Sequence, residues 1–451
     1  MSVGTGADLR VAQPAHTRWN FTVFGADIAF FSLGLSISSA YTVMPLFVHH
    51  LTPDNFLVAL IPAIRALGLF GPQLLVAPLV ERLRHALPFI LVCTILERVP
   101  YLVLGLGALW LAHSNTALLL VLFFVMVFLA LFGGGLTYPA WLDMIARAIP
   151  GNWLGRFLGF WTGLGGVLGI GGAAIAAALL AQEPWPLNFA LCFILTFAAM
   201  VVSFVLLSLG REPPRAVRAK SVRSPGRDTS APRETIAVQR SVLQQTRELW
   251  ALVRSDDGLR RLIVSNGLVG ISTMAGALFA ITALKLGGLS YAEVGVESTV
   301  LFVAMTGGNF LWGAIGDRFG HRSILVWGSL ATAISAALAL WAHGFWLYAL
   351  IFLLFGLNTA AVNMAGFTLI TEFGPESRRP TYVALASVSY APFAIGAPLI
   401  GGWLADRWGY TPVFIVSAMT GALALLAFQF WVPNPRARKT ATENTSGTVM
   451  G

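Results

Sequence analysis

Long apolar segments alternate with short polar ones along nearly the whole chain. Each apolar segment reaches or exceeds the roughly 20 residues that an α-helix needs to cross the hydrocarbon core of a bilayer. Six lie before a polar interval and six after it, near residues 20–48, 55–80, 87–112, 116–146, 154–181, 186–209, 260–286, 291–316, 323–343, 345–372, 380–405 and 411–432. This pattern predicts an all-α membrane protein with twelve transmembrane helices in two bundles of six.

Composition and the placement of charge also indicate a multi-pass membrane protein. Hydrophobic residues fill 57% of the 451 positions and charged residues 11%, whereas soluble domains carry about 25% charged residues. The net charge of +9 does not indicate a nucleic-acid partner, because nearly all Lys and Arg lie in alternate loops. This asymmetry follows the positive-inside rule and predicts that the basic loops and both termini face the cytoplasm.

The long polar interval, residues 210–259, predicts a basic cytoplasmic linker between the bundles. Its arginines lie among prolines and serines, a composition that favours disorder. Its later part, from Ala237 to Val253, has apolar spacing compatible with an amphipathic helix on the inner leaflet. The alternative is a solvated tether attracted to anionic lipid. The predicted division of the chain is a bundle, the linker, a second bundle and a tail, over residues 1–209, 210–259, 260–435 and 436–451.

A glycine-rich charged stretch, residues 313–322, lies where one apolar segment ends and the next begins, and it reads GAIGDRFGHR. Glycines allow two helices to approach and turn tightly, and the charged residues pin the turn at the aqueous face. Its fixed positions are Gly313, Asp317, Arg318, Gly320 and Arg322. A degenerate copy in the first half, residues 77–85, reads APLVERLRH and keeps an acid–arginine pair at Glu81 and Arg82. The chain therefore contains an internal repeat.

Read as G-x-x-x-D-R-x-G-x-R, this stretch resembles the signature loop of the major facilitator superfamily of secondary transporters. Twelve spans, the 6+6 split and the central basic linker extend the resemblance over essentially the whole chain. It implies two six-helix bundles related by a pseudo-twofold axis along the membrane normal, around a midplane cavity that opens alternately to either side. It also implies that Asp317 forms a latch in the cytoplasmic gate, with Arg378 or Glu372 as its partner.

Ionisable groups at membrane depth are costly, so those within the predicted spans are candidates for substrate binding or proton coupling. The first three spans contain Asp27, Arg65, Glu97 and Arg98. In one interpretation the acids take and lose a proton, while an arginine releases it or meets an anionic cargo. In the other, the four residues form structural ion pairs that lock neighbouring helices. Helical rise places Arg65 within reach of Glu97, and the resemblance implies a peripheral third helix, which favours a structural Glu97–Arg98 pair.

Further candidates lie in later spans. Asp143 and Arg147, one turn apart at the inner end of the fourth span, form either part of the cytoplasmic gate with residues 81–82 or a simple surface pair. Near the outer end of the eighth span, Glu297 is either a protonation site or a cation lure, or it is wetted from outside.

Two amides, Asn358 and Asn363, recur at helical spacing in the tenth span. They either line the cavity or join helices by hydrogen bonds.

Motifs typical of enzymes are missing from the sequence. The chain contains no G-x-x-x-x-G-K-[ST], H-E-x-x-H, C-x-x-C or G-x-S-x-G pattern, so neither ATP-driven pumping nor these enzyme chemistries are predicted. No cofactor or metal site is expected.

The predicted function is secondary active transport of a small solute by alternating access, as a proton-coupled efflux antiporter. The expected setting is the plasma membrane, with the protein as a monomer and its partners a small-molecule substrate, the lipid bilayer and a proton or ion gradient. The alternatives are an importer of a small organic anion anchored at Arg65, a lipid-moving or scrambling protein of the same fold, and an integral membrane enzyme acting on lipid-linked substrates.

Overall fold

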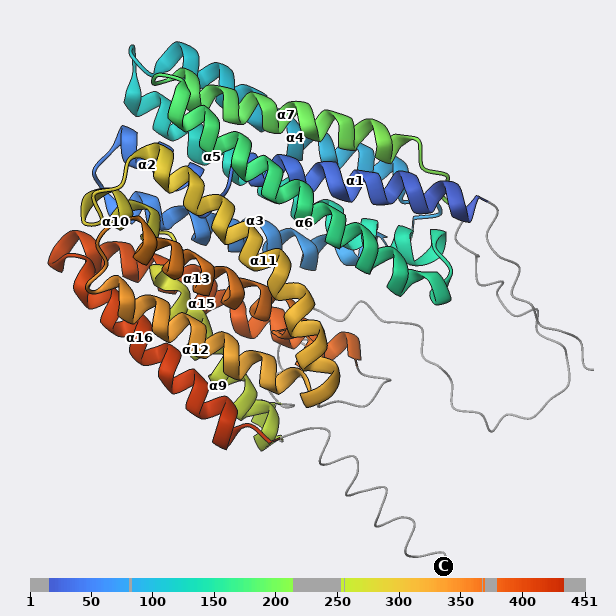
Figure 1. Cartoon of the computed structure of the whole chain (residues 1–451). Helices are drawn as coiled ribbons and strands as arrows, with labels where there is room; N and C mark the ends of the chain where they lie inside the picture. The colour runs from blue at the N-terminus through green and yellow to red at the C-terminus, as the bar shows by residue number, and fades with distance from the viewer. Residues whose placement is uncertain are drawn as a thin grey trace, which may run out of the picture.

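The computed structural model describes residues 16–80, 83–213, 253–254, 256–366, 368–369 and 379–433. Every element in that part of the chain is helical (Figure 1). In chain order the elements are α1 (Thr17–Ile37), α2 (Val43–Leu51), α3 (Asn55–Val80), α4 (Leu87–Leu111), α5 (Thr116–Ala148), α6 (Gly151–Gln182), α7 (Leu187–Ser208), α9 (Asp257–Ser272), η1 (Thr273–Ala275), α10 (Phe279–Lys285), α11 (Tyr291–Phe319), α12 (His321–Ala339), α13 (Phe345–Ala365), α15 (Arg379–Trp408), α16 (Tyr410–Leu426) and the π-helical η3 (Ala427–Trp431).

The described residues contain eleven helical spans long and apolar enough to cross a membrane. The 30-residue helix α15, about 45 Å long, supplies the twelfth. Two predicted spans are broken: the first divides into α1 and α2, and the seventh into α9, η1 and α10. Hydroxyl side chains lie at the first break, where Ser39 Oγ accepts a hydrogen bond from the Tyr41 amide at 3.2 Å. Such local bonds compete with helical ones, which accounts for the interruption.

The helices form two bundles, α1–α7 and α9–η3, that lie side by side (Figure 1). They meet along two seams, where α3 packs against α15 and α6 packs against α11. In each seam the second span of one bundle packs against the fifth span of the other: α3 and α11 are the second spans, and α6 and α15 are the fifth. A twofold rotation that exchanges the bundles therefore also exchanges the two seams. This is the pseudo-twofold arrangement that the resemblance implied.

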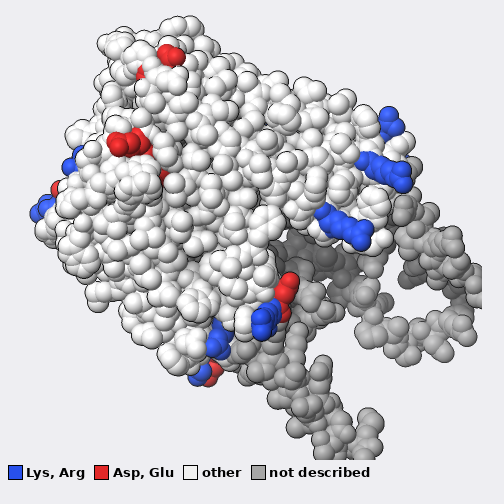
Figure 2. Space-filling model, in the orientation of Figure 1, with Lys and Arg blue, Asp and Glu red and all other residues white. Residues whose placement is uncertain are grey.

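The two ends of the molecule differ in what they carry. At one end, called the linker end here, α1 begins at Thr17, α7 ends at Ser208 and α9 begins at Asp257. The opposite end, called the far end, carries α2 and α10 (Figure 1). In Figure 2 the flank between the ends is almost free of charged side chains, and Lys and Arg gather toward the linker end. Residues 214–252 and 434–451 lie outside the described residues, so the predicted linker helix and tail stay predictions.

Side chains from the two bundles meet at the far end. Thr42 Oγ1 lies 2.6 Å from Ser298 Oγ of α11, and His50 Nδ1 lies 3.3 Å from the Tyr291 hydroxyl. These contacts close the far end of the space between the bundles.

Toward the linker end the bundles separate. One face of α6 carries glycines at positions 155, 159, 163 and 166, and it faces α11. A Cβ built at Gly166 would lie 2.6 Å from an α11 side chain, and one at Gly163 would lie 3.4 Å from another. Among the described residues, a Cβ at Gly159 or Gly155 would meet nothing within 4 Å. The described parts of α6 and α11 therefore diverge toward the linker end.

Candidate functional site

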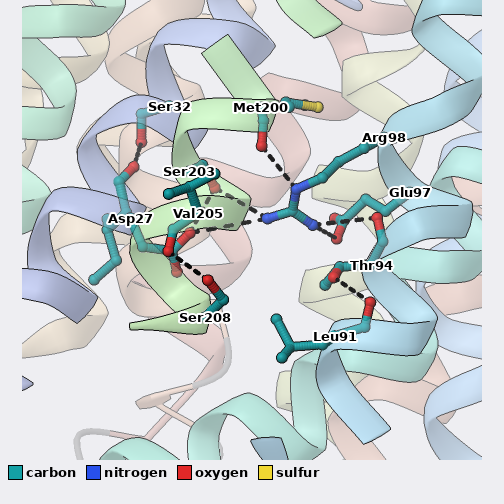
Figure 3. Close-up of polar contacts among 11 residues, drawn as sticks. Asp27, Ser32, Leu91, Thr94, Glu97, Arg98, Met200, Ser203, Val205 and Ser208 are labelled. Carbon is teal, nitrogen blue, oxygen red and sulfur yellow. Dashed lines mark hydrogen bonds and ion pairs between the residues drawn. The ribbon is translucent and has the colours of Figure 1, made fainter. Parts of the chain in front are cut away.

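A buried polar network in the first bundle centres on Arg98 of α4, which is 4% exposed. Its Nε donates to the Met200 carbonyl at 2.9 Å and its Nη1 donates to the Thr94 carbonyl at 3.3 Å. Its two ion pairs join Nη1 to Glu97 Oε2 at 3.5 Å and Nη2 to Asp27 Oδ1 at 3.9 Å (Figure 3). One guanidinium thus joins α1, α4 and α7.

Ser203 of α7 connects the arginine to the aspartate. Its hydroxyl donates to Asp27 Oδ1 at 2.5 Å and accepts from Arg98 Nη2 at 3.0 Å. Asp27 is 5% exposed, so these contacts replace water around a buried carboxylate. The role of Ser203 was not predicted from the sequence, because one hydroxyl in an apolar span is ordinary and its partners lie on other helices.

A cavity of about 200 Å³ adjoins this network between α1, α4, α5 and α7. The carboxyls of Asp27 and Glu97 form part of its wall, and most of the remaining lining is apolar, with Phe31, Tyr138 and Trp141 among the lining residues. Residues of α1 and α5 line the cavity from two sides, because these helices pack only slightly against each other. Two acids and one arginine therefore meet a space large enough for several water molecules.

Arg65 of α3 lies apart from this network. Its guanidinium lies over the Tyr41 ring, 5.2 Å from the ring centre. Among the described residues no ion pair joins Arg65 to Glu97, which pairs with its neighbour Arg98 instead. Helical rise fixes depth but not direction, and α5 packs against both α3 and α4 and keeps them apart.

At the linker end, Arg147 forms ion pairs with two acids of the first bundle. Its Nη2 lies 2.9 Å from Asp143 Oδ2 and 2.6 Å from Glu212 Oε1. The Glu212 carboxylate also accepts hydrogen bonds from the Ala86 and Leu87 amides, at 2.7 and 2.8 Å, and so caps the start of α4. The predicted i,i+4 pair is present, and Glu212, in the segment that follows α7, adds a second acid. The gate partners Glu81, Arg82, Glu372 and Arg378 lie outside the residues with described side chains.

The charged elbow at residues 313–322 turns within one residue. Gly320 alone separates α11 from α12 and has φ +89°, a conformation that glycine adopts without strain. A Cβ on Gly316 would lie 2.9 Å from the Ile324 side chain, so the two helices approach closely. Arg322 donates to the carbonyls of Gln429 and Val432, at 2.8 and 3.1 Å, and joins the elbow to the last helix. Asp317 and Arg318 are exposed, and Gly313 lies 3.7 Å, measured from a built Cβ, from Met364.

Glu297 is fully buried near the far end of α11. Within the described part of the chain neither of its carboxylate oxygens has a hydrogen-bond partner. The alternative that it is wetted from outside is wrong for this conformation. Its neighbour Glu293 is exposed and closes a capping box with Ser290.

The two amides of the tenth span separate. Asn358 is 1% exposed, and its amide has no hydrogen-bond partner among the described residues. It faces α12, since a Cβ built on Gly328 would lie 3.6 Å from Asn358 Oδ1. Asn363 is exposed, so the two do not line one cavity together.

Comparison with known proteins identifies the family. A sequence model described as Major Facilitator Superfamily matches residues 26–285 and 262–448. The chain belongs to the Major Facilitator Superfamily. It is 23% identical over 434 residues to the uncharacterized protein Rv2209 of Mycobacterium tuberculosis (strain ATCC 25618 / H37Rv), a match that covers 90% of this chain and 77% of the relative. It is also 30% identical over 132 residues to the multidrug resistance protein MdtG of Klebsiella pneumoniae (strain 342), across 29% of this chain and 31% of that one.

Solved structures share the fold of this major facilitator. The nucleoside transporter NupG has a TM-score of 0.65 at 11% identity, with 91% of this chain and 98% of that chain covered. A D-xylose-proton symporter has a TM-score of 0.64 at 15% identity, with 93% and 97% covered. The family and these neighbours are transporters, so this major facilitator is a multi-pass membrane transport protein and not an enzyme.

A second charged elbow of this major facilitator escaped sequence analysis. Asp406, at the end of α15, accepts hydrogen bonds from the Asn55 amide at 2.9 Å, the Asn55 side chain at 2.7 Å and the Phe56 amide at 2.8 Å. An acid of the second bundle thus caps the start of α3 in the first. The signal was available, because residues 402–409 read GWLADRWG and repeat the G-x-x-x-D-R-x-G pattern of 313–320. Gly409 has φ +81°, close to that of Gly320.

Proposed function

We propose that this major facilitator exports a small amphipathic solute in exchange for protons across the plasma membrane. The observation that carries the proposal is the buried network of two carboxyls and one guanidinium beside a cavity in the first bundle. The linker end is placed in the cytoplasm, because the basic loops gather there and the positive-inside rule then applies.

The charge count of the network supports proton exchange. Asp27 and Glu97 carry two negative charges against the single positive charge of Arg98, so the buried group is neutral when it holds one proton. Charge at membrane depth is costly, which favours binding of that proton. Glu97 is the better acceptor, because Asp27 already accepts from Ser203 while Glu97 has a single contact of 3.5 Å with the arginine.

The observed conformation fits the inward-facing step of such a cycle. With the far end closed and the linker end open, a solute enters from the cytoplasmic side. Rocking of the bundles along the α3–α15 and α6–α11 seams then opens the far end and releases the solute outside. Protons from the exterior reach the network and return the bundles to the inward-facing state.

Export is supported by the partial match to a protein named for multidrug resistance. Import of a small organic anion is the second candidate, and the observation that favours it is the absence of a carboxylate beside Arg65 among the described residues. A lipid scrambler of the same fold would move lipid without any dependence on an ion gradient.

Proteoliposomes with an imposed pH gradient test the proposal. A panel of amphipathic fluorophores of each charge sign is loaded, and efflux is followed together with internal pH. We expect the gradient to drive efflux in the wild type. Glu97→Gln should lose the gradient dependence but keep solute exchange at equal pH, and Asp257→Asn, which removes an exposed carboxylate, should behave as wild type. Efflux that ignores the gradient in the wild type, or remains coupled in Glu97→Gln, would contradict the proposal.

A further inference from the structure

Arg65 is partly buried, and among the described residues its surroundings differ from those of Arg98 and Arg147 in the same bundle. Arg98 is matched by two carboxylates, and so is Arg147. Among the described residues no acid lies within ion-pair distance of Arg65. Its guanidinium instead makes a cation–π contact with the ring of Tyr41. It lies ten residues into α3, about 15 Å from the far end of that helix and so near the middle of the bilayer.

The surroundings of Arg65 come from both bundles. Tyr41, at the break in the first span, packs edge-on against Phe355 of α13, with ring centres 5.6 Å apart. The phenols of Tyr390 of α15 and Tyr101 of α4 lie near enough to interact with the Arg65 charge. We call Arg65, Tyr41, Tyr101, Phe355 and Tyr390 the Arg65 site.

A guanidinium at membrane depth is stabilised by an anion, and the cation–π contact with Tyr41 supplies only part of that stabilisation. Among the described residues no carboxylate forms an ion pair with Arg65, so its guanidinium is available to an anionic solute. Guanidinium binds carboxylates through two parallel hydrogen bonds. The rings that surround it offer flat apolar faces to a planar group.

We infer that the transported solute is an amphipathic aromatic acid, whose carboxylate binds Arg65 and whose ring lies among Tyr41, Phe355 and Tyr390. The inference rests on the proposed transport function and names its substrate class. Because Tyr41 and Phe355 belong to different bundles, such a solute would bridge them and follow the pathway as the bundles rock.

The test is ligand binding to the purified full-length protein, read as a shift in melting temperature, since binding to the folded state raises apparent stability. Three probes share one ring system and differ in charge: naphthalene-2-carboxylate, 2-naphthylmethanol and 2-naphthylmethylamine. We expect the carboxylate to bind the wild type at least tenfold more tightly than the alcohol or the amine. Equal responses to the three probes, including no response to any, would overturn the inference.

Substitutions at Arg65 and Tyr41 test whether the preference for the carboxylate probe depends on the Arg65 site. Arg65→Gln should lose the tenfold preference, Arg65→Lys should keep part of it because the charge remains without the planar fork, and Arg260→Gln, at an exposed pair, should keep all of it. If Arg65→Gln does not fold, Tyr41→Leu serves in its place and should weaken carboxylate binding severalfold. A full preference in Arg65→Gln or Tyr41→Leu would overturn the site.

The binding measurement uses no gradient, so its outcome is separate from that of the transport proposal. A carboxylate preference without proton-driven flux would support the Arg65 site and contradict proton exchange. Proton-driven flux of neutral or cationic fluorophores without a carboxylate preference would support proton exchange and contradict the Arg65 site.

Discussion

Arg98 is held by groups on every side, and this decides what its removal does. Two carboxylates, a serine hydroxyl and two backbone carbonyls surround one guanidinium. A buried ion pair contributes little to stability compared with apolar side chains in place of all its members. Removal of one partner alone is destabilising, because it leaves an uncompensated buried charge. The network therefore makes different predictions for single and combined substitutions.

Arg98→Met should lower the free energy of unfolding by about 3–5 kcal/mol, because two carboxyls stay buried without their cation. The combination of Arg98→Met with Asp27→Asn and Glu97→Gln should recover most of that loss. Denaturant titration in detergent compares these proteins with Arg260→Met, whose exposed pair should contribute less than about 1 kcal/mol. An undiminished loss in the triple variant would assign the effect to side-chain packing.

At the residue scale the sequence located the charges but not their partners. Apolar runs mark depth, so Asp27, Glu97 and Arg98 could be predicted as buried, and the structure brings them together. The direction of each side chain around its helix depends on packing between helices. For that reason the sequence could place Arg65 and Glu97 at similar depth but could not show that Glu97 pairs with Arg98, and the role of Ser203 was missed.

At the scale of elements, the Asp406 cap joins the two seam helices at the far end. Asp406→Ala removes three hydrogen bonds to a charged acceptor, each worth roughly 1.5–3 kcal/mol. We expect the closed far end to become at least about tenfold less populated, since 1.4 kcal/mol corresponds to a tenfold change. Pulsed EPR distances between labels near the far-end termini of α2 and α16 measure the shift. The adjacent exposed Arg407→Gln is the control, and an unchanged distance in Asp406→Ala would show that the cap does not hold the end closed.

The same end should respond to pH through Asp54, in the loop before α3. Partial burial, and then the neighbouring Asp406 carboxyl, raise the pKa of Asp54 above its ordinary 3.8. An acid whose pKa is raised in the closed state stabilises that state fully when the pH lies below the ordinary pKa. This stabilisation is lost as the pH rises through the raised pKa. We therefore expect far-end closure to weaken as pH rises from below 3.8.

The far-end distance, followed over a pH titration, checks this expectation. Asp54→Asn, which mimics the protonated acid, should keep the end closed and remove the dependence on pH. A dependence that persists in Asp54→Asn would assign it to another group.

Among the elements, the spans were predictable and their interruptions were not. Long apolar runs define α3 to α7 with little ambiguity. In the sequence, the break between α1 and α2 is marked only by Ser38, Ser39 and Thr42. These side chains are small and weakly polar, so they do not interrupt the apolar pattern. The elbow at 402–409 could have been found, because its motif repeats the one at 313–320 at the opposite end of the second bundle.

On the scale of the whole molecule, the two elbows predict opposite effects. The resemblance assigns Asp317 to a latch that closes the linker end, whereas Asp406 joins the two bundles at the far end. Asp317→Asn should slow transport severalfold without lowering the melting temperature, because an exposed residue is changed and the core is not. Flux and thermal unfolding of the same preparation measure the two effects. Wild-type flux in Asp317→Asn would remove Asp317 from the gate.

Twelve spans, two bundles and the family could all be predicted from the sequence, because hydrophobic length and a charged motif determine them. Which end is open could not. Two conformations of the same bundles satisfy the same pattern of apolar residues, and only contacts such as Thr42–Ser298 distinguish them.

The central claim is that the bundles open one end at a time. Two pairs of spin labels test it most directly, one pair across the far end and one across the linker end, with distances recorded in wild type, Asp406→Ala and Asp317→Asn. The account predicts that the far-end distance lengthens as the linker-end distance shortens in Asp406→Ala, and that Asp317→Asn shifts both in the opposite sense. Ends that open together, or that change independently, would contradict it.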